Sequence, residues 1–108
     1  MASPLIEFPA DDPDRALRFW RGVLDVELVL RDERAGKGWE VEVDGLRLGV
    51  HERGRGPGDT GSLPYFTIAD MDAALARVTD LGGTLIHPGE RWSICRDSEG
   101  SPFALAAR

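Results

Sequence analysis

Apolar residues recur at helical spacing in two stretches of the chain, residues 12–24 and 70–81. The first begins with Asp12 and Pro13, a capping residue and a residue suited to the first turn, and the second begins with Asp70. Because apolar residues then return every three or four positions, the pattern predicts two amphipathic helices that each bury one face. The predicted faces are Ala16, Phe19, Trp20, Val23 and Leu24 in the first helix and Met71, Ala74, Leu75 and Val78 in the second.

Short runs of β-type residues surround the two helices and predict eight strands. Asp44-Gly45 is a two-residue hairpin signal between the third and the fourth run. The predicted order is therefore β-α-β-β-β, a polar glycine-rich stretch, and β-α-β-β-β again. The runs cover residues 5–8, 26–31, 39–43, 46–51, 63–68, 84–87, 91–96 and 103–107.

The second half of the chain repeats the first. When the two halves are aligned, Leu5 falls on Leu63, Asp12 on Asp70 and Leu17 on Leu75. Two copies are too few for a solenoid, so the repeat indicates two half-barrels that share one core. We expect one domain over residues 1–108, with a first module over about 1–53, a linker over about 54–62 and a second module over about 63–108.

Composition narrows the function classes. The 108 residues include 13 Lys and Arg against 19 Asp and Glu, and the net charge of -6 disfavours binding to nucleic acid. Cys95 is the only cysteine, which excludes an intrachain disulfide and a thiolate zinc cluster, and we expect its thiol to be inert. Residues 1–4 show no signal-peptide pattern and no apolar run approaches membrane-spanning length, so we expect a cytoplasmic protein that does not enter a membrane.

Three segments resemble the vicinal oxygen chelate superfamily, which includes glyoxalase I, extradiol dioxygenases, fosfomycin resistance enzymes and bleomycin-binding resistance proteins. Residues 8–16 (FPADDPDRA) and 65–74 (YFTIADMDAA) are similar to the openings of its modules, and residues 95–103 (CRDSEGSPF) to the module ending. The resemblance implies an α+β fold in which two βαβββ modules form a cupped eight-stranded mixed sheet with one helix behind each half. It also implies a homodimer.

The same resemblance bears on metal binding. Enzymes of the superfamily hold a divalent metal with four His or Glu side chains, one from the first and one from the last strand of each module. These positions fall here on Leu5, Gly49, Leu63 and Ala104, none of which has a donor atom in its side chain. We therefore expect neither a metal nor another cofactor.

Strand alternation then decides which side chains face the cup. It directs Glu7, Arg47, His51 and Tyr65 into the cup and places Trp92 near its wall, and we take these five as candidate ligand-binding residues with no catalytic residue. Each has an alternative: Glu7 pairs with Arg47 across the sheet, contacts a ligand or acts as a base. His51 is either a solvated residue at a strand end or a ligand contact, and Tyr65 is either a binding wall or an ordinary half-buried tyrosine.

These patterns favour a metal-free small-molecule binding protein of the glyoxalase/bleomycin-resistance type, which sequesters a cationic or amphipathic compound. The alternative is a glyoxalase-type lyase or isomerase with a non-standard or absent metal site, and a third class is a module that takes no ligand. We also expect a homodimer that joins edges of the cupped sheets, because strand 63–68 has no charge and only one proline to protect it.

Overall fold

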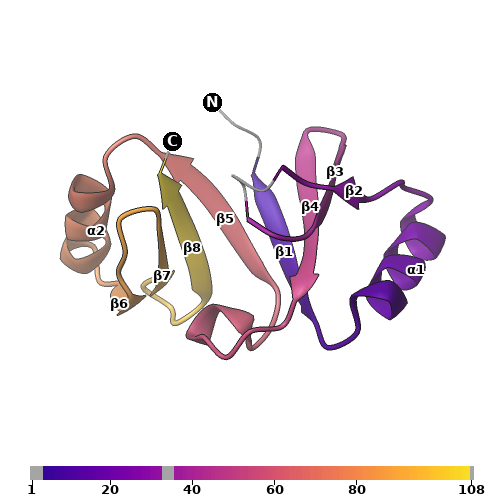
Figure 1. Ribbon diagram of the computed structural model, residues 1–108. Helices are drawn as coiled ribbons and strands as arrows, with labels where there is room; N and C mark the ends of the chain where they lie inside the picture. The colour runs from indigo at the N-terminus through magenta and orange to yellow at the C-terminus, as the bar shows by residue number, and fades with distance from the viewer. Residues whose placement is uncertain (1–3, 33–35, 108) are drawn as a thin grey trace.

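The structure is a computed structural model that describes residues 4–32 and 36–107 and shows two modules of the same element order (Figure 1). Residues 1–3, part of the segment without a signal-peptide pattern, lie outside the described residues. The first module comprises β1 (Leu5–Ala10), α1 (Pro13–Leu24), β2 (Val29–Leu30), β3 (Trp39–Val43) and β4 (Leu46–Glu52). The second comprises β5 (Leu63–Ile68), α2 (Met71–Asp80), β6 (Thr84–His87), β7 (Trp92–Arg96) and β8 (Pro102–Ala107), and a short 3-10 helix, η2 (Pro57–Asp59), lies between the modules.

All eight strands form one mixed sheet in the order β2-β3-β4-β1-β5-β8-β7-β6. In each module the first strand pairs in parallel with the last, and β1 and β5 join the modules as antiparallel neighbours. The expected α+β fold of two βαβββ modules is therefore confirmed, and the modules pair within one chain. The expectation that strand 63–68 is an unprotected edge is wrong, because β5 lies between β1 and β8; the edges are β2 and β6.

Both helices begin at the predicted residues. The side chain of Asp12 accepts a hydrogen bond from the backbone N–H of Arg15, and Asp70 caps α2 in the same way through Ala73. The chain leaves α2 through Gly82, whose φ of 96° lies in the left-handed region. Neither helix among the described residues is long and apolar enough to cross a bilayer.

The core of the first module differs from the predicted helix face. Leu17 is buried there, whereas Phe19 and Val23 are 58% and 61% exposed. The reason is the orientation of α1, whose side around Leu17 packs against the sheet. The predicted strand over 26–31 shrinks to Val29–Leu30, since Leu28 leaves the ladder and packs into the core. Among the described residues, most of the buried apolar side chains form three clusters. One lies in the first module (Ala10, Leu17, Leu28 and Val50) and two lie in the second (Leu63, Ile94 and Ala104; Met71, Ala74 and Leu105).

Candidate functional site

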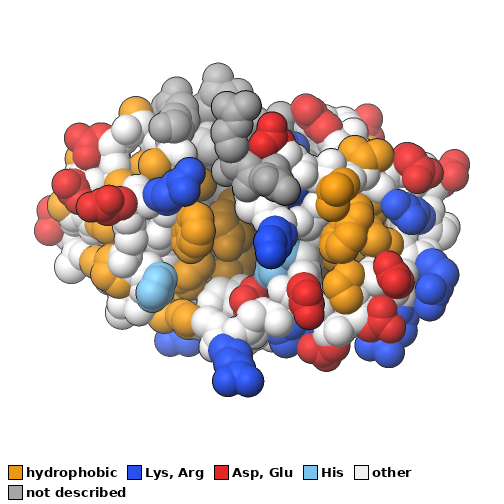
Figure 2. Space-filling model, viewed as in Figure 1, with side chains coloured by type: hydrophobic (Ala, Val, Ile, Leu, Met, Phe, Trp, Pro, Cys, Tyr) orange, Lys and Arg blue, Asp and Glu red, His pale blue; other side chains and the backbone are white. Residues whose placement is uncertain are grey.

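A cavity of about 750 Å³ lies over the seam between the two modules. Figure 2 shows a hollow between the two halves of the molecule, with hydrophobic side chains inside it. The five residues singled out from the sequence all line the cavity: Glu7, Arg47, His51, Tyr65 and Trp92. Alternation along the strands thus brings them to one face as predicted, while their role in binding stays a prediction.

Strand register gives the cavity an apolar end and a polar end. At the apolar end Thr67, Ala106 and Trp92 lie side by side on β5, β8 and β7. Tyr65, two residues before Thr67 on β5, lies beside Leu5 of β1. Glu7 is two residues further along β1, and His51 of β4 lies beside Pro9, at the charged end of the cavity. A molecule that filled the cavity would therefore meet aromatic and aliphatic surface at one end and charged groups at the other.

Glu7 is buried at the polar end, and its partner is a residue that the sequence did not single out. Both carboxylate oxygens of Glu7 accept hydrogen bonds from Nη2 of Arg31, at 3.0 and 3.1 Å, and the same nitrogen donates to the carbonyl of Trp39. The predicted pair of Glu7 with Arg47 is wrong, because the register places Arg47 beside Leu5 rather than beside Glu7. The Nη1 atom of Arg47 instead lies 3.7 Å from the Oε2 atom of Glu40.

The residue beside Glu7 on β4 is Gly49, which makes room for this ion pair. A Cβ atom on Gly49 would overlap the Oε2 atom of Glu7 and the Nη2 atom of Arg31. The guanidinium of Arg31 therefore reaches Glu7 across a backbone that carries no side chain.

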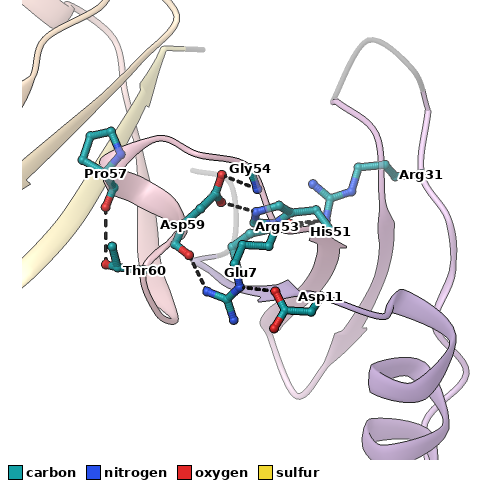
Figure 3. A network of polar contacts seen from close by, with 9 residues as sticks. All are labelled: Glu7, Asp11, Arg31, His51, Arg53, Gly54, Pro57, Asp59 and Thr60. Carbon is teal, nitrogen blue, oxygen red and sulfur yellow. Dashed lines mark hydrogen bonds and ion pairs between the residues drawn. The ribbon is translucent and has the colours of Figure 1, made fainter.

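His51 lies between two carboxylates (Figure 3). Its Nδ1 atom is 2.7 Å from Oε1 of Glu7, and its Nε2 atom is 2.5 Å from Oδ1 of Asp59. An ionised carboxylate only accepts hydrogen bonds, so two ionised partners require a proton on each ring nitrogen, and this geometry favours the imidazolium form of His51. The hydrogen bond to Glu7 raises the pKa of His51, burial opposes that rise, and the hydrogen bond to Asp59 adds to it.

The interpretation of His51 as a solvated residue at a strand end is therefore wrong, since its side chain is only 20% exposed. Asp59, its second partner, falls in the predicted linker over about 54–62, where the sequence indicates no site residue. Its carboxylate accepts from the backbone N–H of Gly54, and its carbonyl accepts from Nη1 of Arg53. No sequence pattern predicts these contacts, because the turn of η2 is what brings Asp59 next to His51.

The two aromatic candidates, Trp92 and Tyr65, both line the cavity as expected. Trp92 is more than half exposed at the apolar end. Burial, and then the negative charges of Glu7 and Asp59, raise the pKa of Tyr65, so its phenol keeps its proton at neutral pH. Burial also raises the pKa of the Cys95 thiol, which agrees with an inert cysteine.

The residues of the cup do not fit a divalent metal. The positions that the resemblance aligns with metal ligands, Leu5, Gly49, Leu63 and Ala104, offer no side-chain donor. Across residues 4–32 and 36–107, no group of three or more His, Cys, Asp or Glu side chains is placed to hold a metal ion.

Comparison with known proteins bears first on the family. A model of the family described as "Glyoxalase-like domain" matches residues 6–106. No curated protein matches the chain significantly.

Comparison with solved structures bears on the fold. An NAD-dependent benzaldehyde dehydrogenase from Legionella pneumophila is 17% identical with a TM-score of 0.75, and the match covers 96% of this chain and 97% of that one. A glyoxalase/bleomycin resistance protein/dioxygenase superfamily member from Vibrio splendidus is 14% identical with a TM-score of 0.64 over 100% of both chains. A variant of methylmalonyl-CoA epimerase from Streptomyces coelicolor, in complex with 2-nitronate-propionyl-CoA, is 19% identical with a TM-score of 0.64, over 99% of this chain and 96% of that one. At these identities the likeness shows the fold alone.

Proposed function

The chain belongs to the Glyoxalase-like domain family, and on this premise we propose that it binds a small amphipathic molecule in its cup without a metal ion. The observation that carries the proposal is the cavity between the modules, which is apolar at one end and charged at the other. Its volume of about 750 Å³ falls within the range of pockets that take small molecules. The protein then acts by sequestering its ligand.

The apolar end suits the body of such a ligand. Trp92 offers an exposed indole beside the small side chain of Ala106, and both residues line the cavity. Tyr65 adds a second aromatic surface one step along the strands. Aromatic side chains bind apolar and flat groups through their large contact area and favourable ring geometry.

The polar end suits a hydrogen-bonding group rather than a full positive charge. Glu7 is the buried carboxylate that a cationic ligand would seek, but Arg31 and His51 already hold both of its oxygen atoms. Arg31 and His51 thus already compensate the charge of Glu7, and a cation that displaced either of them would break a buried ion pair. The proposal therefore favours the amphipathic ligand over the purely cationic one.

Fluorescence titration with 8-anilinonaphthalene-1-sulfonate, an aromatic amphipathic probe, tests the proposal. We expect one saturable site per chain, and Trp92→Ala should raise the Kd roughly 5- to 15-fold by removing aromatic contact area. Phe66→Ala is the matched control, because Phe66 follows Tyr65 on β5, is exposed and does not line the cavity. Equal Kd values for the wild type and Trp92→Ala, or an equal loss in Phe66→Ala, would contradict binding in the cup.

A further inference from the structure

The connector between the modules, which is the linker predicted over about residues 54–62, is held to the first module through Asp59. The carboxylate of Asp59 lies against Nε2 of His51 and accepts from the N–H of Gly54, and its carbonyl oxygen accepts from the side chain of Arg53 (Figure 3). Asp59 contacts one ring nitrogen of His51, and Glu7, which comes from β1, contacts the other. One acidic residue therefore joins η2 to the end of β4.

The residue before Asp59 lies against the second module. A Cβ atom on Gly58 would be 3.0 Å from Cδ1 of Ile94 and 3.6 Å from Cδ1 of Leu63. Ile94 and Leu63 belong to the buried cluster that includes Ala104, and Tyr65, which lines the cavity, packs against it. The connector thus covers apolar side chains of the second module while Asp59 ties it to the first.

The contact of Asp59 with His51 depends on one proton of the ring. A neutral imidazole has a single N–H and so cannot donate to both Glu7 and Asp59. Glu7 is held in place by burial and by Arg31, whereas Asp59 is on a single turn of 3-10 helix and has a side chain 22% exposed. When the ring loses its proton, Asp59 is the carboxylate that loses its contact with His51, and its side chain then keeps only the hydrogen bond from Gly54.

We propose that Asp59 and the imidazolium of His51 form a latch that holds the connector against the cup, and that loss of the proton from His51 releases it. Release lifts Gly58 from Leu63 and Ile94 and widens the cup at that end. The latch itself is independent of what the cup binds, and its effect on ligand entry rests on the proposed function.

The groups around His51 set the direction of the switch. Glu7 from β1 and Asp59 from the connector touch the ring, and Arg31 compensates Glu7 from its far side. Tyr65 on β5 stays a neutral phenol, and Arg53 is held by Asp11 at 2.7 Å. Lys37, Glu40, Arg47 and Glu52 line the same cavity. The latch is closed below the pKa of His51 and opens as pH rises through it.

Amide hydrogen exchange at Gly54 reports the latch, because this N–H donates to the carboxylate of Asp59. After correction for the intrinsic exchange rate, protection at Gly54 should fall at least tenfold as His51 titrates, with both followed by NMR. Asp59→Asn keeps a hydrogen-bond acceptor but removes the negative charge beside the ring, so the midpoint of His51 should be lower and protection at Gly54 should no longer follow the titration of His51. Glu90→Gln, which removes an exposed acid outside the cavity, is the control and should behave as the wild type.

Two results would overturn the latch: protection at Gly54 that stays constant while His51 titrates, or an unchanged His51 midpoint in Asp59→Asn. The wild-type pH series gives this answer even if the variant does not fold. Stopped-flow binding of 8-anilinonaphthalene-1-sulfonate tests the gating of entry, with faster association expected above the midpoint and in Asp59→Asn. Equal rates would refute the gating, whereas no probe binding in any form would refute the proposed function and leave the latch to the exchange result.

Discussion

Gly49→Ala should break the ion pair at the polar end of the cup without removing either of its charges. The new methyl group would overlap the carboxylate of Glu7 and the guanidinium of Arg31. Neither group has an easy retreat, because the side chains of Arg31 and Glu7 are only 9% and 6% exposed. The substitution therefore forces apart two buried charges that now compensate each other.

The expected loss follows from the burial of the pair. Leaving a buried charge without its partner lowers the free energy of unfolding by roughly 3–5 kcal/mol, and we expect about 3 kcal/mol here because both charges remain in the chain. For a domain of this size that loss lowers the Tm by roughly 12 °C or more. Gly22→Ala is the control: no atom lies within 4 Å of its Cβ, and alanine in α1 should stabilise the fold by about 0.5–1 kcal/mol.

Urea unfolding followed by tryptophan fluorescence measures these differences. The same Gly49→Ala change is then made in a Glu7→Ala/Arg31→Ala background, where the methyl group has nothing charged to displace. In that background we expect Gly49→Ala to lower the free energy of unfolding by less than about 1 kcal/mol. The difference between this loss and the loss in the wild type is the coupling energy between the new methyl group and the ion pair. A cost that is small in the wild type, or equal in the two backgrounds, would refute the reasoning.

Three further outcomes are expected. The raised pKa of His51 contributes stability that is fully present below about pH 6.5, its unfolded value, and is lost as pH rises through the folded value, so the urea midpoint should fall over that window in the wild type but not in His51→Gln. Excess chelator should leave the Tm unchanged, and a drop of several degrees would mean that a bound metal stabilises the fold. Sedimentation equilibrium at micromolar concentration should show a homodimer, joined through edge strand β2 and the outer face of α1. These surfaces carry exposed apolar side chains, those of Phe19, Val23, Val29 and Leu30. Leu30→Asp should therefore give monomers, and a monomeric wild type would contradict the pairing.

The elements and their order could be predicted because local signals specify them. Asp12 and Asp70 each cap a helix through the backbone three residues later, and Asp44-Gly45 forms the hairpin with both φ angles positive. These features depend on near neighbours in the chain, so sequence patterns carry them. The face of α1 could not be predicted as well, because apolar residues cover more than one side of it and only packing decides between Leu17 and Phe19.

The candidate site was predictable to the level of faces but not of partners. Alternation alone brings Glu7, His51 and Tyr65 to the cavity, since a strand shows every second residue to one side. The partner of Glu7 depends on register, which puts Gly49 beside it, and on the path after β2, which brings in Arg31. Neither is encoded in a short pattern, and so the pair with Arg47 was the wrong choice.

Gly49 connects the missing metal donors to the ion pair. The resemblance aligns Gly49 with a metal-ligating residue, and the space that such a side chain would fill is taken by Glu7 and Arg31. A donor side chain at this position is therefore incompatible with the buried pair, and the pair is incompatible with a donor. Since the charge of Arg31 is fixed at any ordinary pH while that of His51 is not, the positive charge beside Glu7 is partly permanent and partly titratable. When the latch opens, Glu7 therefore loses the charge of His51 but keeps the ion pair with Arg31, whereas Asp59 loses its only charged partner at the ring.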